Sequence, residues 1–238
     1  MNCQVYLEVG ADGRAMAHVP ALPGCVAVAR TRDEVLAATP AAIERYVGWL
    51  IDHGEVVTME IADIELTAES RGFGPFDPGD KAALLPPDRE PVAPQEMTTL
   101  FRWMGYSRDD LLGLIRNVPD EVLLEPYTEG WSIDTILRHI GGAEVWYVTR
   151  IDEDWRFDDY EEHRTSDTAL DWLERTRMAV IARLRRLSPE ERACVFCPSA
   201  YTHHPDEEWT ARKVFRRFLE HEGEHRAQIE AVLAARGV

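Results

Sequence analysis

The sequence lacks long apolar runs and has few cysteines, and both absences narrow the class of protein. No stretch reaches the about 18 apolar residues that a transmembrane helix needs. The opening segment, MNCQVYLEVG, has neither the basic part nor the apolar part of a secretory signal peptide. The 4 cysteines are too scattered for a disulfide framework in 238 residues, so free thiols are expected. We therefore expect a cytoplasmic protein that does not bind membranes.

Basic residues are also scarce, and almost none of them is lysine. The chain has 26 basic against 43 acidic residues, which gives a formal net charge of -17, and its only lysines are Lys81 and Lys213. A surface with this charge repels phosphate, and no local run of basic residues offsets it. The composition therefore predicts no nucleic-acid partner.

Residues 1–68 have the pattern of a small α+β domain. An Asp-Gly pair at Asp12 and Gly13 separates the first two strand-like runs and is typical of a hairpin turn. The expected elements are strands over 3–9, 14–19 and 25–29, a helix from an N-cap at Thr31 to a stop at Gly54, and a strand over 56–66. This order predicts a ββ(β)αβ unit.

A change in composition separates this unit from a helical one. Residues 69–94 are dense in proline and glycine and show no regular periodicity, which predicts a linker. Residues 95–238 contain four stretches with helical spacing, at about 95–117, 132–151, 167–187 and 210–235. A four-helix bundle is the simplest packing for them, so the fold class is α+β followed by all-α.

Three histidines fall on apolar faces of the predicted helices. His221 and His225 continue the apolar stripe of the last helix at i and i+4, a spacing at which two imidazoles can bind one metal ion. His139 lies in register with Ile136 and Ala143 on the apolar face of the second helix. Burying three imidazoles together is costly unless they share a ligand. We therefore predict a divalent metal site, for zinc, nickel or iron, with one coordination position open to water or substrate.

The segment from His221 to His225 also matches the H-E-x-x-H pattern of zinc proteases. The residues after His225 are predicted to be helical and offer neither a third ligand nor an edge strand to align a peptide. We therefore expect no protease. The sequence leaves two hypotheses open for Glu222. It acts as a general base beside a metal-bound water, or it faces solvent about 100° away from the histidine stripe.

Two further cysteine and histidine pairs lie in the loop before the last helix. Cys194 and Cys197 have C-x-x-C spacing, and His203 and His204 follow them. The cysteine pair does not open a helix after a strand, as a thioredoxin-like motif does. Ordinary loop packing is favoured over a second metal site or a redox pair.

The helical region resembles the DinB superfamily over about residues 95–238. The carrying residues are Trp131-Ser132-Ile133, Leu137-Arg138-His139-Ile140 with Glu144, Trp209-Thr210-Ala211, and His221-Glu222 with His225, Gln228 and Ile229. The resemblance implies an up-down-down-up four-helix bundle, often dimeric, with a divalent metal on His139, His221 and His225. It also implies an S-transferase or isomerase that uses mycothiol, bacillithiol or glutathione, although many members have no known activity.

The first unit resembles the HicB-like antitoxin fold. The carrying segments are Tyr6-Leu7-Glu8-Val9, His18-Val19-Pro20-Ala21-Leu22-Pro23-Gly24-Cys25 and Thr31-Arg32-Asp33-Glu34-Val35. The resemblance implies a domain that blocks a toxin ribonuclease. The DNA-binding module of such antitoxins is absent here and the bundle takes its place, so residues 1–68 are expected to bind a ligand, a protein partner or a second copy of the chain.

Two functions follow as hypotheses. In the first, the bundle is a metalloenzyme that acts on a small-molecule substrate, either as an S-transferase with a low-molecular-weight thiol as co-substrate or as a metal-assisted hydrolase. In the second, the metal is structural and the protein is a non-catalytic regulator related to toxin–antitoxin systems. An open coordination position favours the first hypothesis, and a closed one favours the second.

Overall fold

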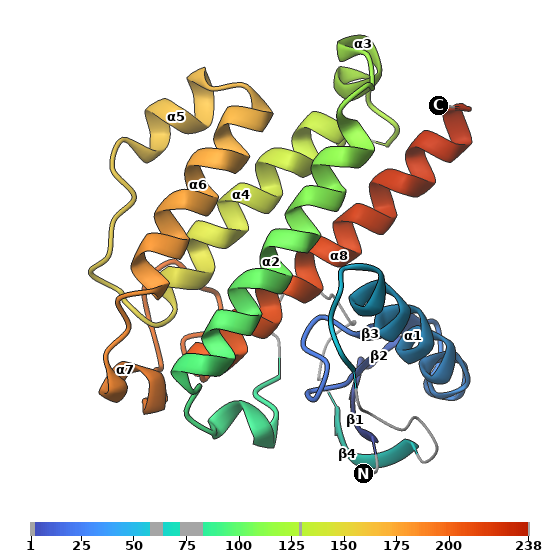
Figure 1. The fold of residues 1–238 in the computed structure, drawn as a ribbon, viewed down its shortest axis with the longest axis vertical. Helices are drawn as coiled ribbons and strands as arrows, with labels where there is room; N and C mark the ends of the chain where they lie inside the picture. Colours follow the sequence, from blue (N-terminus) through green and yellow to red (C-terminus); the bar gives the residue numbers. More distant parts are fainter. Residues whose placement is uncertain (1–2, 58–63, 72–82, 129, 238) are drawn as a thin grey trace. The chain divides into compact units, whose positions relative to one another are not determined.

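The computed structural model describes residues 3–57, 64–71, 83–128 and 130–237. The chain divides into two compact units, Met1–Glu90 and Pro91–Val238 (Figure 1). None of the helices in these ranges is both long and apolar enough to cross a membrane.

The first unit is a four-stranded mixed sheet with one long helix. Its elements are β1 (Cys3–Val9), β2 (Ala15–His18), β3 (Val26–Ala29), α1 (Arg32–Asp52), β4 (Ile64–Arg71) and the 3-10 helix η1 (Pro86–Arg89). The strand order is β3-β2-β1-β4, with β1 antiparallel to β2 and parallel to β4. The predicted ββ(β)αβ order is confirmed.

Local chemistry explains most of these boundaries. Gly13, with a φ of 87°, supplies the left-handed turn residue between β1 and β2. The Thr31 side chain accepts a hydrogen bond from the Glu34 amide and begins α1, as predicted. The fourth strand was predicted over 56–66, whereas β4 spans Ile64–Arg71, and residues 58–63 lie outside the described part. Among the described residues, Val56 and Val57 are not in a strand, and the strand continues past the predicted end at Leu66 because the polar residues that follow still pair with β1.

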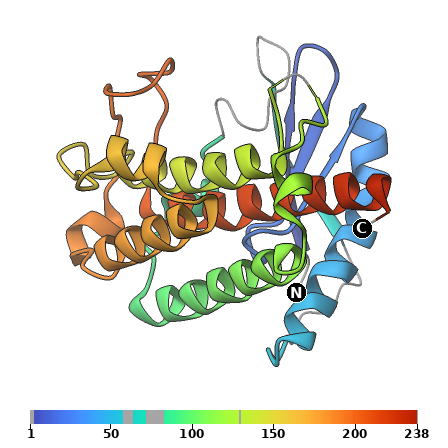
Figure 2. The ribbon, with the colours of Figure 1, turned by 90° about the horizontal axis from the view of Figure 1, so that it is seen from above.

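The second unit contains four long helices, which run side by side in Figure 2. They are α2 (Pro94–Ile115), α4 (Ile133–Thr149), α6 (Ala169–Leu184) and α8 (Ala211–Arg236), and three short helices lie between them: α3 (Asp120–Leu124), α5 (Tyr160–Ser166) and α7 (Pro189–Ala193). Ser132, Ser188 and Thr210 cap α4, α7 and α8 with their side chains. The predicted four-helix bundle is confirmed.

Side-chain contacts give the helix directions. Arg212 and Arg226 of α8 bind Glu96 and Asp110 of α2, so these contacts advance along both helices and α2 and α8 are parallel. In α4 and α8 the order is reversed: His139 contacts His221, whereas Tyr147 contacts Phe218. These two helices are therefore antiparallel.

The helices α4 and α6 are parallel and pack closely. The Trp172 indole donates to the backbone oxygen of Arg138 at 3.0 Å, and Arg183, near the end of α6, binds Asp152, just beyond the end of α4, at 2.6 Å. Trp172 is fully buried against Gly141, where a Cβ would lie 2.4 Å from the indole nitrogen. The four directions together give the up-down-down-up bundle that the family resemblance implied.

Candidate metal centre

The structure brings His139, His221 and His225 together between α4 and α8. The Nε2 atom of His221 lies 3.0 Å from that of His139 and 3.1 Å from that of His225. One nitrogen from each ring falls within a group whose members are all within 4.8 Å of one another. His221 is buried, His225 is half-buried and His139 is exposed, so the cluster opens to solvent on the α4 side.

Helix geometry explains this convergence. The i and i+4 spacing stacks His221 and His225 one turn apart on α8. Because α4 runs antiparallel to α8, His139 faces them from the other helix. The three ring nitrogens therefore meet at one point although 82 residues separate His139 from His221.

A second layer of hydrogen bonds fixes the tautomer of His225. Its Nδ1 atom lies 2.8 Å from the Gln228 side-chain oxygen, which can only accept, so Nδ1 carries the proton. The Gln228 amide nitrogen donates to the Tyr127 hydroxyl at 2.6 Å, which holds the amide in that orientation. The Nε2 atom of neutral His225 is therefore left with a free lone pair that points at the cluster.

Aromatic rings border the three histidines. The Trp131 ring stacks on His225 with centroids 6.4 Å apart and meets the edge of His139 at 5.4 Å. A tight turn places Trp131 there: its amide donates to the Thr128 oxygen, and Gly130 adopts a φ of 80°. Tyr147 approaches His221 from another side at 5.8 Å. These rings restrict the approach of water and leave the exposed edge of His139 as the open side.

The surroundings favour neutral imidazoles. Burial, followed by the neighbouring histidines and Arg217, lowers the pKa of His221 well below its ordinary value. Burial lowers the pKa of His225 to about 4, against the opposing effect of Gln228, and desolvation also lowers the pKa of His139. All three rings are thus free of a second proton at neutral pH, which is the state that binds a metal.

The contacts among the three rings are not satisfied by hydrogen bonds alone. A ring nitrogen can donate or accept in its plane but cannot do both, so Nε2 of His221 can bond only one of its two close neighbours. The other contact is then left without a hydrogen bond. A cation shared by the three nitrogens removes this conflict, and two nitrogens bound to one tetrahedral zinc lie roughly 3.3 Å apart. The donor set therefore fits a divalent metal ion.

Glu222 is in neither of the places predicted for it. Its side chain is buried, with 1% of its surface exposed, so it does not face solvent. Its Oε2 atom accepts from Arg108 Nε at 2.8 Å and from Arg177 Nη2 at 2.8 Å. Burial would raise the pKa of Glu222, but the two guanidinium groups outweigh this and lower it. A carboxylate held in this way is a poor proton acceptor, which argues against the predicted role as a general base.

Glu222 belongs to a buried charge quartet to which each long helix contributes one residue: Arg108 of α2, Glu144 of α4, Arg177 of α6 and Glu222 of α8. Arg108 Nη2 bridges Glu144 at 2.5 Å and Glu222 at 2.6 Å, and Arg177 binds the same two carboxylates. The remaining donors reach backbone oxygens of Leu173 and Met104. The two positive and two negative charges cancel, so the quartet is a structural element with no free charge for catalysis.

The other cysteines and histidines lie outside this centre. Cys194 and Cys197 are both exposed thiols, and neither they nor His203 and His204 belong to the described metal-ligand cluster. Their loop is held against the end of α4, where Trp146 donates to the Tyr201 oxygen at 2.7 Å. Sequence reasoning assigned no role to Tyr127, which carries no motif and reaches the centre only through Gln228.

Two comparisons with known proteins give matches. The profile of the DinB superfamily matches residues 104–229, more than half of the chain and a range that includes all three histidines. The crystal structure of TT2238, a four-helix bundle protein, aligns with a TM-score of 0.42 and 18% identity over 56% of this chain and 98% of that one. No curated protein matches.

The family match covers residues of the second unit alone. It does not reach residues 1–68, so the HicB-like resemblance of the first unit stays a prediction. In the second unit, the family match and the helix directions agree. This chain belongs to the DinB superfamily.

Proposed function

We propose that the helical unit binds one divalent metal ion through His139, His221 and His225 and acts on a small molecule bound at the open side of that ion. The observation that carries the proposal is the convergence of the three Nε2 atoms, two of whose separations are 3.0 and 3.1 Å. The first test is whether the metal is present.

The test compares the metal content of the untagged protein, purified without chelators, with that of variants. We expect about one zinc, nickel or iron ion per chain in the wild type and none in the His221→Ala/His225→Ala protein. The matched control is His203→Ala, which removes an exposed histidine from outside the cluster and should keep full occupancy. Equal metal content in all three proteins, or none in the wild type after reconstitution, would refute the proposal.

The residues around the three histidines orient the ligand atoms and leave one side open to a small substrate. Gln228 holds His225 with its lone pair toward the cluster, Trp131 covers one side, and the exposed edge of His139 leaves another side open. A bound divalent ion would supply Lewis acidity, which lowers the pKa of a thiol or a water. The open side favours an enzyme over a protein in which the ion is only structural.

Cobalt substitution distinguishes the two substrate classes. We propose a low-molecular-weight thiol as the co-substrate, and glutathione and cysteine are suitable probes. When either is added to the cobalt-loaded protein, direct sulfur binding produces a thiolate-to-cobalt charge-transfer band, which O-methylated serine, as a thiol-free control, does not produce. Absence of the band with every thiol would favour metal-assisted hydrolysis, tested with ester and amide substrates. Absence of any metal-dependent turnover would favour the regulatory hypothesis, with residues 1–68 as the partner-binding unit.

A further inference from the structure

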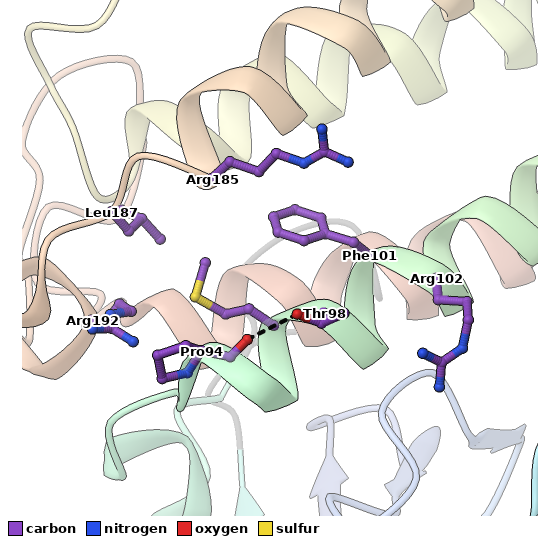
Figure 3. Close-up of a pocket in the computed structure, with 8 residues that line it drawn as sticks. Pro94, Thr98, Phe101, Arg102, Arg185, Leu187 and Arg192 are labelled. Carbon is purple, nitrogen blue, oxygen red and sulfur yellow. Dashed lines mark hydrogen bonds between the residues drawn. The ribbon is translucent and has the colours of Figure 1, made fainter.

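A groove on another side of the bundle has the features of a second binding site. It lies between the start of α2 and the end of α6 and has a volume of about 560 Å³ (Figure 3). Met97, Phe101 and Leu187 give it an apolar floor, Arg185 and Arg192 form its rim, and Arg102 also lines it. The metal centre lies between α4 and α8, so the groove belongs to a different pair of helices.

The two rim arginines differ from many other arginines of this acidic protein. Arg175, Arg183 and Arg226 each bind a carboxylate directly. Arg185 instead packs its guanidinium over the Phe101 ring at 5.5 Å, and Arg192 donates to the backbone oxygen of Ser188 at 3.4 Å.

The guanidinium groups at the rim therefore keep donors available for a ligand. Within the described ranges, neither Arg185 nor Arg192 has a carboxylate at ion-pair distance, although Glu190 interacts with Arg192 electrostatically from farther away. A guanidinium presents several donors in one plane and suits a carboxylate. In a chain with a formal net charge of -17, such a pair of cations marks a local preference for an anion.

The floor of the groove specifies the rest of the ligand. Met97 and Leu187 are each 7% exposed, so their side chains form a surface that is already largely withdrawn from water. The thioether of Met97 and the ring of Phe101 adapt to an aliphatic chain or to a flat aromatic body. The volume is in the range of about 300–1,000 Å³ that is typical of small-molecule sites.

We propose that this groove binds a small amphipathic carboxylate, with its anionic group on the guanidinium of Arg185 or of Arg192 and its apolar body on Met97, Phe101 and Leu187. The site is independent of the metal centre, so its ligand neither requires nor contacts the metal. Neutral compounds with the same apolar body lack a partner for the two guanidinium groups and bind more weakly.

The experiment uses the full chain and the fluorescent anion 1-anilinonaphthalene-8-sulfonate as the reporter, displaced by octanoate. The test variant is Arg185→Gln/Arg192→Gln. The matched control is Arg186→Gln, which removes one positive charge from the exposed neighbour of Arg185 that does not line the groove. We expect saturable binding in the wild type, about tenfold weaker binding in the double variant, and less than a twofold change in the control.

Octanol provides the test of charge, and 1-naphthoate tests the shape of the apolar body. Octanoate should displace the reporter at much lower concentration than octanol, and stronger displacement by 1-naphthoate would identify a flat aromatic acid as the better fit. Circular dichroism and metal content should be the same in all variants, which shows that the fold and the metal centre are intact. The proposal is wrong if the double variant binds like the wild type, if Arg186→Gln weakens binding equally, or if octanol competes as well as octanoate.

Discussion

Replacement of Arg177 by methionine should destabilise the helical unit strongly, because it leaves a buried negative charge without compensation. Arg177 is 8% exposed and binds Glu144 through Nε at 3.0 and 3.1 Å and Glu222 through Nη2 at 2.8 Å. Burial alone would lower the pKa of Arg177, but the two carboxylates outweigh it and raise the pKa, so the guanidinium is charged at every accessible pH. Without it, Arg108 alone must serve both carboxylates.

The expected loss in the free energy of unfolding follows from the one guanidinium that remains for two buried carboxylates. Removal of one partner from a buried ion-pair network costs about 3–5 kcal/mol in the free energy of unfolding, a large part of the about 5–15 kcal/mol of a typical domain. The Arg177→Met/Glu144→Leu double variant keeps Arg108 paired with Glu222 and is neutral again. It should therefore be more stable than the sum of the two single changes predicts, by up to about 3 kcal/mol.

The assay is urea unfolding of the apo protein with a chelator present, because metal binding would add to the measured stability. Tryptophan fluorescence reports mainly on the helical unit, since among the 7 tryptophans only Trp49 lies in the first unit. The control is Arg175→Met on the same helix, which breaks the exposed Arg175–Asp167 pair and should cost less than about 1 kcal/mol. A loss below about 1 kcal/mol for Arg177→Met, or strict additivity in the double variant, would refute the reasoning.

Three further predictions concern the metal centre and the contact between α4 and α6. Folding lowers the pKa of His225 from 6.5 to about 4, so between pH 6.5 and pH 4 the unfolded chain binds more protons than the folded chain. The free energy of unfolding of the apo protein should therefore decrease as the pH falls through this range. An unchanged urea midpoint would contradict this. Gly141→Ala should cost about 1–3 kcal/mol in thermal or urea unfolding because its Cβ would lie 2.4 Å from Trp172, whereas Gly142→Ala, with its nearest contact at 3.6 Å, should be tolerated. Gln228→Leu should weaken zinc binding about 10- to 100-fold in competition with a chromophoric chelator, and unchanged affinity would remove Gln228 from the centre.

The histidine cluster could be predicted because it depends on helical periodicity. The 3.6-residue period places His221 and His225 on one stripe and His139 on the apolar face of another helix, whatever the loops do. The Thr31 and Thr210 caps followed from the same kind of local rule. The continuation of β4 past Leu66 did not, because the extent of a strand depends on pairing with β1, which is a long-range contact.

The charge quartet could not be predicted, because arginine and glutamate are residue types that are expected on the surface. Arginine and glutamate are rarely buried unless they are paired, and the partners of Glu222 lie 45 and 114 residues away in the sequence. A sequence pattern assigns a face to each residue of a helix but does not say whether that face is covered. In α8 the histidine face and the Glu222 face are each packed against other helices, so a charged residue off the apolar stripe is still interior.

The neighbours His221 and Glu222 show why the H-E-x-x-H pattern does not specify a reaction. In a zinc protease the glutamate acts as a base on the metal-bound water, which requires a free carboxylate on the metal side. Here the step of about 100° between adjacent helical residues turns Glu222 to the bundle centre, where two guanidinium groups hold it. The same ion pairs fix the rotation of α8 about its axis, and that rotation is what presents His221 and His225 to His139. The glutamate of the motif therefore acts on the three histidines only through the orientation of the helix. Under the proposed function, a proton acceptor would have to come from the substrate, from solvent or from another side chain.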